Sequence, residues 1–159
     1  MTNMSEITEL SHLTENKRII GIDPGTKRVG ISVSDETQTI ARPLERIERT
    51  SWKKLLGQIV SVIEEFDACA VVIGLPLDSD GNKTDMTAEA ADMARKLKLS
   101  LKIPVYVRDE RSSSYEAKAR LWEQGTSLNE TRDLVDSEAA VIILEDLLAE
   151  LNLLRKTTS

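Results

Sequence analysis

Acidic residues occur at three places where the surrounding sequence is apolar. Asp23 ends a run of β-branched residues, Asp109 and Glu110 end a second apolar run, and Asp136 lies early in a C-terminal helical pattern. An ionised carboxylate in apolar surroundings loses several kcal/mol of solvation unless it is paired or bound to a metal ion. These carboxylates are therefore the first candidates for chemistry in this chain.

Asp23 belongs to a stretch, residues 18–34, that predicts two short strands joined by a tight turn. The Pro24-Gly25 pair between the two β-branched runs is typical of a turn, and Lys27 and Arg28 follow it. A carboxylate that faces such a turn and two cations suits a metal ion that contacts a phosphate. The alternative is that Asp23 only caps the turn through its own backbone.

Glu110 and Asp136 have separate reasons to join Asp23. The carboxyl ends of parallel strands lie at one edge of a sheet, so Asp23 and Glu110 meet there if their strands are parallel. Residues 136, 140, 143, 147 and 151 fall on one helical face, so Asp136 continues an apolar stripe that faces the sheet. The alternative leaves Asp136 partly exposed, where the dipole of the helix N-terminus favours a negative charge.

Three carboxylates without histidine or cysteine form an oxygen-rich site, which suits Mg²⁺ or Mn²⁺ and not zinc. The one histidine, His12, lies in the polar N-terminal stretch, so catalysis by histidine is not expected. A pair of such ions supports in-line attack of water at a phosphodiester. We predict Asp23, Glu110 and Asp136 as both the metal ligands and the catalytic residues. Basic residues near these acids are candidates for binding phosphates: Lys27, Arg28 and Arg111.

The elements that must position these residues follow from hydrophobic periodicity and turn residues. Beyond the two strands within 18–34, the expected strands are 38–47, 68–73 and 103–107, the last running into 108–111, and the expected helices are 51–66, 87–101, 113–124 and 127–151. Pro43 indicates that the third strand is interrupted or lies at an edge. The order predicts an α/β fold. Its mixed five-stranded sheet combines a three-strand antiparallel meander with parallel strands, and helices cover both faces.

Length and composition favour a single domain. The chain has 159 residues, a formal net charge of −6 and one cysteine, Cys69, which lies in an apolar run and is expected in the core. The negative charge argues against a broad electrostatic grip on nucleic acid but allows a local basic patch. No apolar run is long enough to span a membrane, so a cytoplasmic protein is expected. Residues 1–17 and 152–159 are expected to be flexible tails around a domain at 18–151.

Five motifs occur in order, at residues 21–30, 41–44, 72–81, 109–117 and 135–144. Together they resemble the YqgF (RuvX) family of pre-16S rRNA nucleases, also described as Holliday-junction resolvases, over residues 18–150. The resemblance implies an RNase H-like fold with its acidic residues at Asp23, Glu110 and Asp136. It is the resemblance that selects Glu110 over its neighbour Asp109, because Glu110 matches the family's middle acid. It further implies processing of the 5′ end of the 16S rRNA precursor in the bacterial cytoplasm, with the ribosomal precursor particle as a possible partner.

Three other functions stay open at this point. A resolvase of branched DNA would use the same carboxylates and need a homodimer to place two cuts, whereas a monomer suffices for a single cut. An ATPase or sugar kinase of the actin-like type has a similar first phosphate loop but needs two lobes, and 159 residues hold one. A non-catalytic RNA-binding factor in ribosome assembly could share the fold.

Overall fold

The structure of the protein is a computed structural model that describes Leu10, residues 13–111 and residues 128–158. For residue 111, residues 128–136 and residue 158 it describes the backbone only. His12 and the predicted helix at 113–124 lie outside the described residues.

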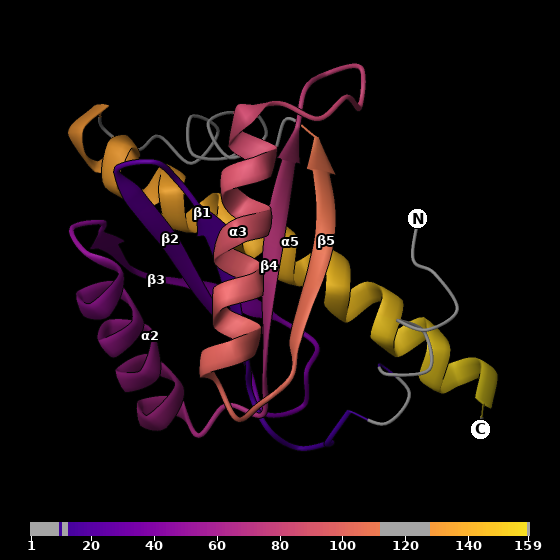
Figure 1. Ribbon diagram of the computed structural model, residues 1–159. Coiled ribbons are helices and arrows are strands. Elements are labelled where there is room, and N and C mark those ends of the chain that lie inside the picture. The colour runs from indigo at the N-terminus through magenta and orange to yellow at the C-terminus, as the bar shows by residue number, and fades with distance from the viewer. Residues whose placement is uncertain (1–9, 11–12, 112–127, 159) are drawn as a thin grey trace.

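A five-stranded mixed sheet forms the centre of the molecule (Figure 1). Its strands are β1 (Ile19–Pro24), β2 (Arg28–Ser34), β3 (Ala41–Glu48), β4 (Ala70–Leu77) and β5 (Val105–Arg111). They lie in the order β3-β2-β1-β4-β5. The first three form an antiparallel meander, and β4 and β5 run parallel to β1. The sheet confirms the predicted fold, and Pro43 lies on the edge strand β3.

Helices cover both faces of the sheet, as predicted. Helices α2 (Trp52–Phe66) and α3 (Asp85–Ser100) lie on one face, and the long helix α5 (Leu128–Thr158) crosses the other (Figure 1). Successive side chains of a strand point to opposite faces, so the β-branched strands fill two cores. Ile20, Ile22 and Ile73 belong to the core under α2 and α3. Ile19 and Val72 belong to the core under α5.

Capping side chains set the starts of the two shorter helices. The hydroxyl of Ser51 accepts a hydrogen bond from the N–H of Lys54 at 3.2 Å at the start of α2. Thr84 and Thr87 form a reciprocal capping box at the start of α3. Each helix agrees with its predicted range to within two residues at either end. Strand β4, in contrast, continues past its predicted end to Leu77, because its ladder with β5 continues to that residue.

The predicted terminal tails need correction. Leu10 and Leu13 are buried in the core under α5, so the predicted boundary at residue 18 excludes residues that pack with the domain. At the other end, α5 continues to Thr158 and does not end at Leu151. The physical reason in both cases is tertiary contact, which holds segments whose composition alone is too polar to predict order. Residues 1–9 lie outside the described residues.

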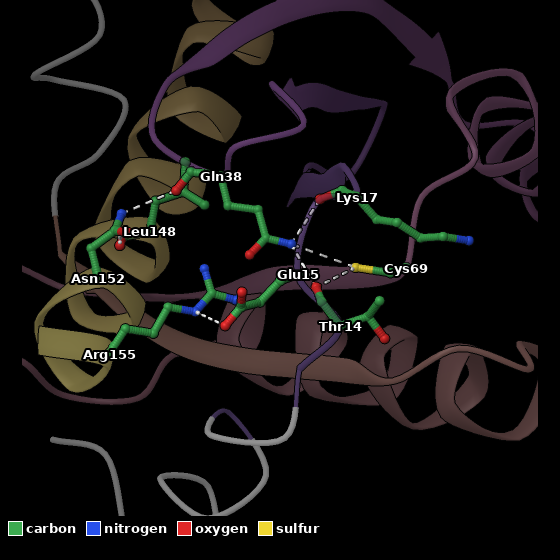
Figure 2. A network of polar contacts seen from close by, with 8 residues as sticks. All are labelled: Thr14, Glu15, Lys17, Gln38, Cys69, Leu148, Asn152 and Arg155. Carbon is green, nitrogen blue, oxygen red and sulfur yellow. Dashed lines mark hydrogen bonds and ion pairs between the residues drawn. The ribbon is translucent and has the colours of Figure 1, made fainter. Parts of the chain in front are cut away.

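Buried Gln38 connects the two terminal segments (Figure 2). It lies in the loop between β2 and β3 with φ = 59°, so the predicted strand at 38–47 begins later, at Ala41. The side-chain Nε2 of Gln38 donates to the carbonyl oxygens of Thr14 (2.9 Å) and Lys17 (2.7 Å). The backbone carbonyl oxygen of Gln38 accepts a hydrogen bond from Asn152 Nδ2 (3.0 Å). Cys69 lies beside this amide in the core, as expected.

Helix α5 lies very close to β1 because Gly21 has no side chain. A Cβ atom at Gly21 would lie 2.9 Å from both the carbonyl oxygen of Ala140 and the Cβ of Leu144. The hydroxyl of Ser32, on the neighbouring strand, donates to that same Ala140 oxygen at 2.8 Å. Glycine at this position therefore sets the distance between the helix and the sheet.

Replacing Gly21 tests this constraint. We expect Gly21→Ala to lower the free energy of unfolding by about 1–3 kcal/mol, because the added methyl group must push backbone apart in a packed core. Gly57→Ala is the matched control, since a Cβ at Gly57 meets nothing within 4 Å. Alanine there should raise the free energy of unfolding by about 0.5–1 kcal/mol through helix propensity. Urea unfolding measures both, and equal effects would contradict the packing argument.

Asp35 organises the loop between β2 and β3. Its carboxylate accepts hydrogen bonds from the N–H groups of Thr39 (2.9 Å) and Ile40 (3.0 Å) and from the hydroxyls of Thr37 and Thr39. Partial loss of solvation raises the pKa of Asp35, but these hydrogen bonds outweigh it and hold the pKa well below its ordinary value. The carboxylate is therefore a stabilising group in its charged form.

The stability of the protein should depend on the ionisation of Asp35. A lowered folded-state pKa contributes stability that is complete above the unfolded pKa of about 4 and is lost as the pH falls below it. We expect Asp35→Asn to lower the urea midpoint at pH 7. We also expect the urea midpoint of this variant to fall less than that of the wild type as the pH is lowered from 5 to 3. Glu64→Gln, at an exposed carboxylate of α2, is the control and should leave that decline unchanged. An unchanged decline in Asp35→Asn would contradict the assignment.

Candidate active site

The carboxyl ends of β1, β4 and β5 lie at one edge of the sheet, and two predicted acidic residues lie there. Ile22 pairs with Ile73, so the next residues, Asp23 and Gly74, lie side by side. Glu110 pairs with Pro76, two residues further along β4. Adjacent strands are about 4.8 Å apart, which puts the backbones of β1 and β5 about 10 Å apart with β4 between them.

Asp23 and Glu110 also share one face of the sheet. Gly21, two residues before Asp23, faces α5, and Arg108, two residues before Glu110, forms an ion pair with Glu150 of α5. Because side chains alternate along a strand, both acidic residues lie on the α5 face. Each is partly buried.

Gly74 keeps the surface of β4 between the two acids free of a side chain. A Cβ at this position would lie 3.5 Å from Cγ of Glu110 and would collide with the side chain of Ile143 in α5. Glu110 therefore lies against the backbone of β4. The strand on the other side of β4 is β1, which carries Asp23. Two of the three predicted carboxylates thus lie on the two strands that flank β4 and share one face of the sheet.

Asp136 lies on the helix that crosses this face. Its backbone belongs to α5, and Ala140 and Ile143, which follow it, pack over Gly21 and Gly74. The side chain of Asp136 is outside the described part of the structure, so its place beside Asp23 and Glu110 stays a prediction.

The basic candidates lie at the same edge as the acids. Lys27 is exposed in the turn after β1, and Arg28 is partly buried at the start of β2. Arg49 holds this turn: its N–H donates to the Lys27 carbonyl oxygen (2.9 Å), and its Nη1 donates to that of Gly25 (3.0 Å). Arg111 ends β5 opposite Leu77, and its side chain is not described.

The described side chains fit a hard divalent cation only in part. Asp23 and Glu110 offer carboxylate oxygens, which Mg²⁺ and Mn²⁺ prefer. Among the side chains that the structure describes, no three His, Cys, Asp or Glu residues gather closely enough to hold a metal ion. The third predicted ligand, Asp136, is not among them, so the complete set remains a proposal.

Sequence reasoning missed two buried polar residues next to Asp136. Ser137 is 1% exposed and Glu138 is 7% exposed. A carboxylate two positions along a helix from a predicted ligand is expected in solvent, because the apolar stripe lies on another face. The sequence pattern carries no signal for the burial of Glu138. Ser137 could have been noticed as the polar neighbour of Asp136 in the fifth motif.

No helix in the described residues is long and apolar enough to cross a membrane.

Comparison with known proteins identifies relatives along most of the chain. The sequence profile of a family described as RuvX, Holliday junction resolvase, matches residues 17–150. A protein of Rickettsia bellii (strain OSU 85-389), provisionally named a pre-16S rRNA nuclease, is 35% identical over 152 residues, 96% of this chain and 97% of the relative. A protein of the same name from Anaeromyxobacter sp. (strain Fw109-5) is 37% identical over 128 residues, 80% of this chain and 93% of the relative.

Solved structures support the fold. Thermus thermophilus RuvC, in complex with a Holliday junction substrate, superposes with a TM-score of 0.53 at 19% sequence identity, covering 86% of this chain and 96% of RuvC. The fold is thus RNase H-like. Together with the profile match and the relatives at 35–37% identity, this shows that the chain belongs to the RuvX (YqgF) family.

Proposed function

We propose that this protein is a metal-dependent nuclease that hydrolyses phosphodiester bonds and processes the 5′ end of pre-16S rRNA. The observation that carries the proposal is the position of Asp23 and Glu110 on one face of one sheet edge, in a chain of the RuvX family. The names of the relatives from Rickettsia bellii and Anaeromyxobacter support pre-16S rRNA as the substrate.

Each candidate residue has a role in this proposal. Asp23, Glu110 and Asp136 would hold Mg²⁺ or Mn²⁺ through carboxylate oxygens, the donors that these ions prefer. Bound there, the ions supply activation of the attacking water and stabilisation of the leaving 3′-oxygen. The phosphates of the substrate are bound by basic residues at the same edge: Lys27, Arg28 and Arg111. Since Arg49 holds the turn, it fixes the positions from which Lys27 and Arg28 approach the substrate.

The partners follow from the charge distribution. A formal net charge of −6 disfavours a broad contact with nucleic acid. Binding is therefore confined to the sheet edge that carries Lys27, Arg28 and Arg111. We propose that the substrate is presented by a ribosomal precursor particle in the cytoplasm, and that the particle adds its own contacts to those made by this edge. A monomer suffices for one cut.

A second candidate function is resolution of branched DNA. The description of the matching family profile, Holliday junction resolvase, favours it. It would use the same carboxylates, but two symmetric cuts require a homodimer. The oligomeric state in solution therefore separates the two candidates before any substrate is tested.

Removing one proposed ligand should abolish cleavage. We expect Asp23→Asn and Glu110→Gln each to slow Mg²⁺- or Mn²⁺-dependent cleavage of labelled 16S precursor RNA by at least about 100-fold. The reason is that a metal ion supplies several kcal/mol of transition-state stabilisation. Excess EDTA should stop the wild-type reaction. The matched control is Glu64→Gln, an exposed carboxylate of α2, which should retain full activity.

The same assay compares the candidate functions. A four-way DNA junction is incubated beside the RNA, with circular dichroism to show that each variant is folded. Cutting of the junction alone would replace the rRNA proposal with the resolvase. Failure of folded wild-type protein to cut either substrate above the Asp23→Asn background would overturn both and favour a non-catalytic RNA-binding factor.

A further inference from the structure

The ladder between β2 and β3 contains a β-bulge close to the proposed site. Val29 pairs with Ile47 but Ile31 pairs with Leu44, so β3 has one more residue than β2 in this interval. A bulge leaves backbone N–H and C=O groups without regular ladder partners. Such groups must find other partners when they are buried.

Ser137 of α5 contacts the first regular pair beyond the bulge, Ile31 and Leu44. Its hydroxyl donates to the carbonyl oxygen of Leu44 at 2.5 Å and accepts a long hydrogen bond from the N–H of Ile31 at 3.5 Å. A serine hydroxyl can donate and accept at the same time, so one side chain serves both strands of the bulge. Since the hydroxyl is buried, α5 can neither slide nor rotate here without breaking hydrogen bonds that water cannot replace.

These contacts fix the part of α5 that carries Asp136. Ser137 directly follows Asp136, and Ile31 of β2 pairs with Ile22 of β1, the residue before Asp23. The anchored point on the helix therefore lies at the level of the sheet where Asp23 is found. The next anchor along the helix, the Ser32 hydroxyl bound to the Ala140 carbonyl oxygen, is one turn further from Asp136.

We infer that Ser137 is a positioning residue, whose hydrogen bonds at the β2–β3 bulge hold Asp136 at the level of Asp23 so that the metal site is preformed. The inference rests on the proposed function, which assigns Asp136 as a ligand. The acceptor for Ser137, the backbone carbonyl oxygen of Leu44, lies within the motif at 41–44. Groups that orient metal ligands commonly affect metal affinity or activity by about 10–100-fold.

The experiment compares Ser137→Ala with Ser32→Ala. Each variant loses one hydroxyl that links α5 to the sheet, but only Ser137 adjoins Asp136. Mn²⁺ binding is measured by calorimetry without RNA, and kcat and KM for precursor RNA are measured at varied Mn²⁺. We expect Ser137→Ala to weaken Mn²⁺ binding by about tenfold or more and to lower kcat with little change in KM. Ser32→Ala should change the urea midpoint and leave Mn²⁺ affinity near the wild-type value.

Two results would overturn the inference: wild-type Mn²⁺ affinity in Ser137→Ala, or equal losses of affinity in the two variants, which would indicate a general loosening of α5. If Ser137→Ala is unfolded by circular dichroism, Ser137→Cys replaces it with the same expectation, since a thiol is a weak hydrogen-bonding group of similar shape. Wild-type protein that binds Mn²⁺ without cleaving RNA overturns the proposed function alone. Wild-type protein that does not bind Mn²⁺ overturns both.

Discussion

The close packing of α5 on the sheet is the constraint on which the rest of the structure depends. Gly21 and Gly74 have no side chains, and the backbone at Ala140 and the side chain of Ile143 occupy the space that a Cβ would need. A larger residue at either position would lift the helix from β1 or β4. Since α5 carries Asp136 while the sheet carries the other two acids, the same lift would separate the proposed ligands.

The proposed site is the polar end of an apolar interface. The core under α5 runs along the sheet, and at the carboxyl ends of the strands it gives way to Asp23 and Glu110. Carboxylates that are partly shielded from water are poorly solvated, and in the proposed function a divalent cation bound by them would offset that cost. In the proposed function, the packing that shields these carboxylates from water would thus also favour the binding of a cation.

Much of the fold could be predicted because local patterns and tertiary contacts agree in the sheet. β-Branched runs marked the strands, Ser51 marked the start of α2, and the parallel order of β1, β4 and β5 put Asp23 and Glu110 at one edge. The terminal segments could not be predicted, because Leu13 and Asn152 are ordered by contacts with residues distant in the sequence.

The supporting residues of the site were also beyond sequence reasoning. The role of Ser137 depends on a bulge whose register follows from three-dimensional pairing and not from residue type. The burial of Glu138 could not be predicted from the sequence either, since an amphipathic pattern places a carboxylate on the exposed face of a helix. Residues that carry out chemistry leave a sequence signature of unusual types in unusual places, whereas residues that hold them in place look ordinary.

The position of α5 in the chain has a consequence for folding during translation. This helix follows all the other described elements, yet it packs across one face of the strands, which are synthesised before it (Figure 1). While a ribosome is still translating the chain, the meander and β4 can pair before α5 has been synthesised. The hydroxyl of Ser32 and the carbonyl oxygen of Leu44 then lack their hydrogen-bond partners on α5. The proposed third acidic residue, Asp136, can therefore join Asp23 and Glu110 only after the strands that carry those two residues have been synthesised.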